Sequence, residues 1–203
     1  MNDSPKIHLS PFEEQLVTDS TWLLTKNAIL EKIKVLLSSL QDGQNEILTA
    51  AKESLPPEVL IPSPKISRGE NYLGLPWMVL DYPRYFDRDN LFAIRTMFWW
   101  GNFFSTTLLL SGVHKDRFCN RITQEWEVLR NDEFYISHNS SAWDHHFESN
   151  NYTALREMDQ LQLRQHLQIH PFIKLAKKIS LENWDTIDKD LLATFNRLIK
   201  IIC

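Results

Sequence analysis

The chain has 203 residues, which is enough for a substantial apolar core, and we expect a single globular domain spanning residues 1–203. A formal charge of −4, with 22 Lys and Arg against 26 Asp and Glu, predicts no nucleic-acid surface, because such surfaces need a basic face. Two cysteines form no disulfide framework and the start of the chain lacks a signal-peptide pattern, so we expect a cytoplasmic protein.

Helices are predicted for the first quarter of the chain. Residues 10–13 read Ser-Pro-Phe-Glu, a capping box with proline at the first helical position. That helix should be short, because further cap residues occur at 18–21. Apolar residues at helical spacing then predict a helix over about 22–40, which Gly43 would end, and another over 44–54.

A proline-rich segment separates these helices from the predicted strands. Residues 55–64 contain four prolines, so we expect irregular backbone that crosses the surface. A strand is predicted over 77–82, with Pro76 at its start, where a missing N–H is tolerated. Residues 82–90 are predicted to form an aromatic, turn-rich loop.

The most aromatic stretch, residues 91–110, predicts a β-hairpin. It is rich in Phe, Trp, Ile, Thr and Leu, and Gly101 and Asn102 interrupt it with a two-residue turn signal. That turn would set Trp99 opposite Phe104 and would give the hairpin two largely apolar faces. We therefore expect cover on both sides, or a cavity on one side.

Arg95 needs a partner in this hairpin, because the predicted register sets it opposite Leu108 and a buried unpaired charge is very costly. The first interpretation is a structural ion pair with Asp81. The second is an anion receptor in an aromatic pocket with Trp99 and Phe104, and the third is an arginine that extends to water. The same charge argues against a membrane span over this stretch.

The pattern of helices, then strands, then helices indicates an α+β fold with an antiparallel sheet built on the aromatic hairpin at about 91–110. The remaining predicted elements are a helix over 115–130, a short strand over 133–137, a polar loop over 138–151, and helices over 153–168, 171–179 and 184–201.

Histidines are the main candidates for metal chemistry. His138, His145 and His146 lie near carboxylates in the polar loop, and His166 and His170 would share one helix face. Together they could supply three ligands and leave an open position. Ordinary hydrogen-bonded histidines are the alternative, since no His-Glu-x-x-His motif is present. The sequence also lacks a phosphate-binding glycine loop and a nucleophile elbow.

Three functions remain open from the sequence. The first is a noncatalytic binding protein, with an aromatic pocket or interface near the central hairpin and a small molecule or a protein as its partner. The second is a metal-dependent enzyme using the 138–148 loop with His166 and His170. The third is a structural or oligomeric interaction protein. We expect neither a nucleic-acid nor a membrane partner, and the sequence specifies no cofactor, reaction or oligomeric state.

Overall fold

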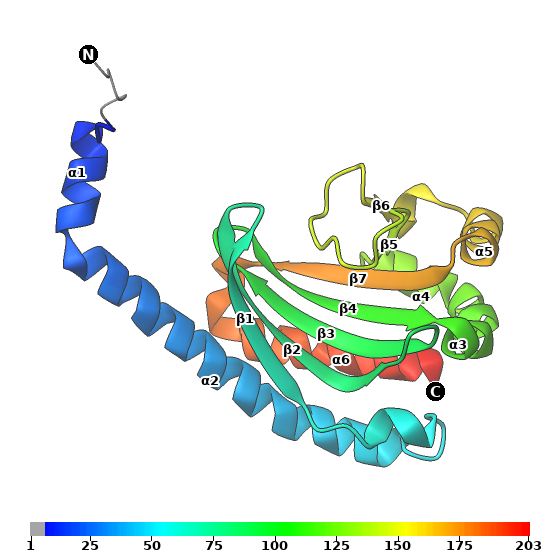
Figure 1. The fold of residues 1–203 in the computed structure, drawn as a ribbon. Helices are drawn as coiled ribbons and strands as arrows, with labels where there is room; N and C mark the ends of the chain where they lie inside the picture. The colour runs from blue at the N-terminus through cyan, green and yellow to red at the C-terminus, as the bar shows by residue number, and fades with distance from the viewer. Residues whose placement is uncertain (1–6) are drawn as a thin grey trace.

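The computed structural model describes residues 7–203 and confirms an α+β fold (Figure 1). One seven-stranded antiparallel sheet has the order β1-β2-β3-β4-β7-β5-β6. The strands are β1 (Lys65–Tyr72), β2 (Leu75–Phe86), β3 (Leu91–Trp99), β4 (Phe103–Ser111), β5 (Tyr135–Ser137), β6 (Tyr152–Ala154) and β7 (Phe172–Ser180). The helices are α1 (Pro11–Thr18), α2 (Ser20–Ala51), α3 (Gly112–Gln124), α4 (Trp126–Asn131), α5 (Gln160–Ile169) and α6 (Ile187–Ile202), with short 3-10 turns η1 (Pro57–Leu60), η2 (Leu155–Glu157) and η3 (Leu181–Thr186). None of the helices in this described part is long and apolar enough to cross a bilayer.

The N-terminal helices confirm one prediction and correct another. Ser10 caps α1 with the predicted capping box, and Asp19 separates α1 from α2. The predicted break at Gly43 is wrong, because α2 runs through it without interruption. A Cβ on Gly43 would lie 2.9 Å from Cδ2 of Leu192 on α6. The glycine therefore allows two helices to approach closely, and their packing outweighs its low helix propensity.

The hairpin is present, but its predicted register is wrong by one residue. The turn has three residues, 100–102, and Gly101 adopts φ +70° within it. Trp99 consequently pairs with Phe103, and Arg95 pairs with Thr107. Because side chains alternate along a strand, this one-residue shift moves every β4 side chain to the face opposite the predicted one.

The largest error concerns residues 171–179, which form the strand β7 and not a helix. This strand pairs with β4 along its whole length, from Phe172 to Ser180. A short apolar run does not distinguish a strand from a helix by its spacing alone, and the unpaired edge of β4 decides in favour of the strand. A strand that was not predicted (β1), a helix broken at Glu125, and a strand and 3-10 turn in place of the start of the 153–168 helix are further differences. Strand β2 also continues to Phe86, into the predicted 82–90 loop, and the predicted helix over 184–201 begins at Ile187, after the 3-10 turn η3.

The two faces of the sheet are covered in different ways. On one face, called here the helix face, α2 and α6 pack on Met78, Leu80, Phe98 and Phe104. Further along the same face, α3, α5 and the C-terminal half of α6 complete the core. The other face, called here the loop face, carries Val79, Met97 and Trp99 under the segment 138–151. Both apolar faces of the hairpin are thus used, one by helices and one by a loop.

Candidate functional site

A β-bulge concentrates side chains on the loop face. Asp81 pairs with Arg95, and after a register shift Arg84 pairs with Ala93. Ala93 and Arg95 are two residues apart on β3, so they share a face, and Arg84 joins them there. Phe86 lies two residues further along β2 and shares that face. Bulges of this kind often re-aim side chains at functional sites.

Arg95 has the predicted partner. Its Nε donates to Oδ1 of Asp81 at 2.7 Å, and its Nη2 donates to Oδ2 at 2.8 Å. The side chain of Asp81 is 6 % exposed and that of Arg95 is 17 % exposed. The third contact of the guanidinium is Nη1 to Nε2 of His145, at 3.0 Å. Since arginine only donates, His145 must accept at Nε2, and its imidazole is therefore neutral.

The segment 138–151 is tied down over the sheet by buried polar groups. The Tyr72 hydroxyl accepts from the backbone N–H groups of His145 and His146, at 2.5 and 3.1 Å, and lies 3.1 Å from Nδ1 of His146. The side-chain amide of Asn151 donates to the carbonyls of Asp144 and His146. The loop has little regular secondary structure, so these side chains supply hydrogen bonds that its buried backbone groups need.

Beneath the loop lies a buried lysine. Lys174 of β7 is 1 % exposed; its Nζ donates to the carbonyl of Asp144 and lies 5.3 Å from the centroid of the Tyr152 ring. Burial lowers the pKa of Lys174 to about 7, although Asp144 opposes the shift. Burial also holds the pKa of His145 well below its usual value, with further lowering by Lys174 and Arg95, and burial raises the pKa of Tyr152.

Two aromatic residues of the loop determine which part of the sheet is open. Phe147 stacks on Tyr152 with centroids 4.5 Å apart, and edge contacts with Phe103 and Tyr135 fill the β4–β7–β5 side. Trp143 instead lies over β2 and β3, where its ring is 5.4 Å from the guanidinium carbon of Arg95. It remains 49 % exposed. The β4–β7–β5 side is therefore sealed, whereas the side below Trp143 is not.

Two adjoining compartments lie beside Trp143, and we call them together the Trp143 cleft. They hold about 240 and 260 Å³. Both are lined by Trp77, Val79, Arg95 and Trp143. The first also includes Asn71, Tyr72, Met97 and His145. The second also includes Lys65, Ser67, Asp81, Arg84 and Phe86.

Charge and shape differ between the two compartments. The second contains three cations, Lys65, Arg84 and Arg95, against one carboxylate, Asp81. That carboxylate is already engaged by Arg95, and neither Lys65 nor Arg84 makes an ion pair with another residue in the described range 7–203. The first is lined mainly by rings and by Met97. The Trp143 cleft therefore combines an aromatic end with a cationic end.

The predicted ligand-binding residues separate in the structure. Arg95 lines both compartments. Trp99 is 6 % exposed and packs edge-on against the Tyr72 ring, and its Nε1 donates to the Tyr72 carbonyl at 3.2 Å. Phe104 is fully buried on the helix face, so it lies on the opposite side of the sheet from Arg95. The one-residue register error explains why the sequence grouped these three together.

The histidines divide between two places. His145 and His146 lie against Arg95 and Tyr72, whereas His166 donates from Nε2 to the Ser137 carbonyl and stacks on His170 with ring centroids 4.0 Å apart. His138 makes its own contact with the Ser149 carbonyl. Burial lowers the pKa of His166 to about 4. Among residues 7–203, no three His, Cys, Asp or Glu side chains lie where they could hold one metal ion.

Several residues of the Trp143 cleft could not be identified from the sequence. Trp143 stood in a polar loop with nothing to indicate what it covers, and Lys65 belonged to a strand that was not predicted. Arg84 lay in a predicted turn, and only the bulge brings it beside Arg95. Lys174, which lies beneath the loop and not in the cleft, gave a signal for β7 alone: it is a charge among the apolar residues 172–176, and a strand buries it.

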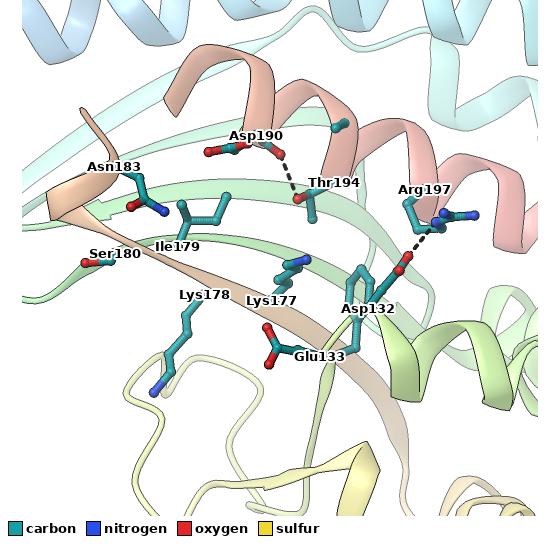
Figure 2. A pocket seen from close by; sticks show the side chains of 12 residues that line it. Asp132, Glu133, Lys177, Lys178, Ile179, Ser180, Asn183, Asp190, Thr194 and Arg197 are labelled. Atoms are coloured by element: carbon teal, nitrogen blue, oxygen red, sulfur yellow. Dashed lines mark hydrogen bonds and ion pairs between the residues drawn. The ribbon is translucent and has the colours of Figure 1, made fainter. Parts of the chain in front are cut away.

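A second hollow lies on the other side of the sheet, between β7, α6 and the turn before β5 (Figure 2). It holds about 560 Å³ and carries equal numbers of acidic and basic side chains: Asp132, Glu133, Asp190, Lys177, Lys178 and Arg197. Arg197 pairs with Asp132 at 2.6 Å, as Figure 2 shows. Because this groove is charge-balanced and mostly polar, it offers less specificity for a ligand than the Trp143 cleft does.

No protein-family model, curated protein sequence or solved structure matches this chain. A functional conclusion therefore has to rest on the geometry and chemistry of the cleft alone.

Proposed function

We propose that this protein binds, without chemical conversion, a small molecule that has a flat apolar group and an anionic group, and that the binding site is the Trp143 cleft. The observation that carries the proposal is the pair of adjoining compartments that share Trp77, Val79, Arg95 and Trp143. Ligand sites are typically concave and mostly apolar, with a few well-placed polar groups.

Size supports a site that uses both compartments. Each compartment alone, at about 240 or 260 Å³, is below the range of roughly 300–1,000 Å³ that small-molecule sites occupy. Together they fall within that range. Trp143 lines both compartments and is half exposed, so a rotation of its side chain would widen the opening between them without any change in the sheet.

The lining supports the chemical class of the ligand. Trp77, Tyr72 and Met97 provide flat or polarizable apolar surface for a ring. Lys65 and Arg84 provide positive charge at the opposite end, and the Arg84 Nε is fixed by the Ser63 carbonyl at 2.8 Å. A guanidinium held in this way is suited to a carboxylate or a phosphate.

The state of the titratable groups supports binding over catalysis. Asp81 has both carboxylate oxygens engaged by Arg95, and His145 has its Nε2 lone pair engaged by the same side chain. Lys174 and Tyr152 are buried beneath the loop and do not line the cleft. A general acid or base must reach a substrate, and in this arrangement none of these groups is free to do so.

We also propose a cytosolic location for this protein. Cys119 and Cys203 are both free thiols, and burial raises the pKa of each. A protonated, partly buried thiol is unreactive and suits a reducing compartment.

The test is calorimetric titration with benzoate, phenylacetate and 2-naphthoate, each beside its neutral amide. We expect at least one carboxylate to bind saturably and its amide to bind more weakly. Arg84→Met and Trp143→Ala should each weaken binding about tenfold or more, the effect of losing one charged or aromatic anchor. Arg130→Met is the matched control, because Arg130 lies on helix α4 and lines neither compartment of the cleft. Binding by none of the carboxylates, or equal losses in the control, would overturn the proposal.

A further inference from the structure

The N-terminal part of the chain projects from the body of the molecule (Figure 1). We call residues 7–28, which include α1 and the start of α2, the arm. No residue of α1 is buried, and the first buried residue of α2 is Leu30. Lys26 pairs with Glu70 of β1 at 2.5 Å, and this contact marks where α2 meets the body.

The arm is unusually apolar for an exposed segment. It carries eight of the large apolar side chains that are exposed in the described chain: Ile7, Leu9, Phe12, Leu16, Val17, Trp22, Leu23 and Leu24. Such a concentration on one short segment is rare in soluble monomers and marks an interaction site. The charges along the arm and the neighbouring apolar surface indicate what covers it.

The charges around the arm are segregated along its length. Glu13, Glu14 and Asp19 lie in and just after α1, and the next charges along α2 are mainly Lys26, Lys32 and Lys34 with Glu31. A segment that is acidic at one end and basic at the other is complementary to itself when two copies run antiparallel. Such pairing about a twofold axis forms each contact twice, as in an isologous dimer.

The apolar surface follows the same pattern. Leu24, Ala28 and Val35 are exposed and share one face of α2, since their spacings of four and seven residues correspond to whole turns. Lys32 and Lys34 flank this stripe on its two sides, at about 60° and about 100° from its centre. The stripe therefore begins on the arm at Leu24 and continues along α2, past Lys32 and Lys34, to Val35 on the outer surface of the body.

Within α1, Phe12 and Leu16 are four residues apart and form a matching stripe beside Glu13. Asp19 has extended backbone and separates α1 from α2, so α1 packs as a short helix of its own. In a twofold pair of antiparallel arms, the α1 stripe of each copy lies toward the α2 stripe of the other, with the acidic residues of α1 beside Lys32 and Lys34.

We propose that this chain forms a twofold-symmetric dimer in which the arms run antiparallel and α1 of each copy lies on the outer face of α2 of the other. The contact joins Phe12 and Leu16 to Leu24, Ala28 and Val35. The dimer does not depend on a ligand in the Trp143 cleft, which lies on the loop face of the sheet.

The test is sedimentation equilibrium of the full chain and of three charge variants. Wild type should form dimers. Glu13→Lys/Glu14→Lys and Lys32→Glu/Lys34→Glu should each raise the dimer Kd about tenfold or more, because each sets like charges together at both ends of the contact. The four substitutions combined should restore wild-type affinity, because they exchange the charges of the two surfaces.

Lys189→Glu/Lys200→Glu, on the exposed side of α6, is the matched control and should leave the dimer unchanged. Glu13→Lys also removes the contact of the Glu13 carboxylate with the Ser10 N–H, so Ser10→Ala, which breaks the same capping box without changing a charge, is its control and should leave the dimer unchanged. Far-UV circular dichroism checks the helix content of every variant. A wild-type chain that stays monomeric would overturn the proposal and indicate a different partner for the arm. A dimer that the arm variants do not weaken, or that the combined variant does not restore, would also overturn it.

Discussion

Replacement of Arg95 by alanine should destabilise the protein strongly through the carboxylate it leaves behind. Asp81 is 6 % exposed at its side chain and accepts two hydrogen bonds from Arg95, at 2.7 and 2.8 Å. Arg95→Ala removes both and leaves a buried, unpaired charge. Breaking a buried pair in this way costs about 3–5 kcal/mol, which at this chain length lowers Tm by roughly 6–20 °C.

The structure contains its own control for this experiment. Arg197 and Asp132 form an ion pair of similar length, 2.6 Å, but their side chains are 43 % and 33 % exposed. A pair of that kind contributes about 0–1 kcal/mol, so Arg197→Ala should have little effect. Urea unfolding, followed by circular dichroism and tryptophan fluorescence, gives the two free energies of unfolding under identical conditions.

A double-mutant cycle isolates the pair itself. Asp81→Ala alone should cost less than Arg95→Ala, because the guanidinium keeps its contact with His145 and is 17 % exposed to water. The double variant should be more stable than the sum of the two losses implies, by about 1–3 kcal/mol. If Arg95→Ala costs no more than Arg197→Ala, or if the two losses simply add, the buried-pair interpretation is refuted.

Three further predictions concern one close contact in the sheet and several buried side chains. Gly69→Ala should displace the Trp77 indole, since a Cβ there would lie 2.6 Å from Nε1, and weaken aromatic-carboxylate binding; a structure of the variant with Trp77 unmoved would contradict this. Lys174 has a pKa of about 7 when folded and about 10.4 when unfolded, so between these values the unfolded state binds more protons and stability should rise with pH. Urea unfolding from pH 7 to 10 should show a rise of up to about 1.4 kcal/mol per pH unit relative to Lys174→Met, and parallel profiles would contradict it. Thr96→Val with Thr106→Val should leave the free energy of unfolding unchanged or higher, because both buried hydroxyls lack a hydrogen-bond partner within residues 7–203; a loss above about 1 kcal/mol would show that they are satisfied.

Elements whose structure depends mainly on residues within them could be predicted from local signals in the sequence. The capping box at 10–13 and the aromatic hairpin are present, and Asp81 is the partner of Arg95, since its strand was predicted beside the hairpin. These features depend on short-range chemistry: a cap, a turn and a charge that requires an opposite charge.

Features that depend on long-range packing could not be predicted in this way. The strand β7 owes its conformation to the free edge of β4, and α2 continues through Gly43 because α6 packs on it. The bulge that brings Arg84 beside Arg95 is a single extra residue in one strand, which no pattern of residue types reveals. Of these three effects, the bulge shapes the Trp143 cleft; much of the remaining lining comes from β1, which was not predicted, and from the 138–151 loop, so the sequence located Arg95 but not the surrounding cleft.

The most direct test of the Trp143 cleft uses the seven tryptophan indole N–H groups as reporters. Their signals in a two-dimensional ¹⁵N NMR spectrum, assigned with single Trp→Phe variants, would be followed during titration with 2-naphthoate. Our account predicts saturable shifts of the Trp77 and Trp143 signals, with the Trp126 signal unchanged, and weaker shifts with 2-naphthamide. Shifts that spare Trp77 and Trp143, or that are equal for the acid and the amide, would contradict it.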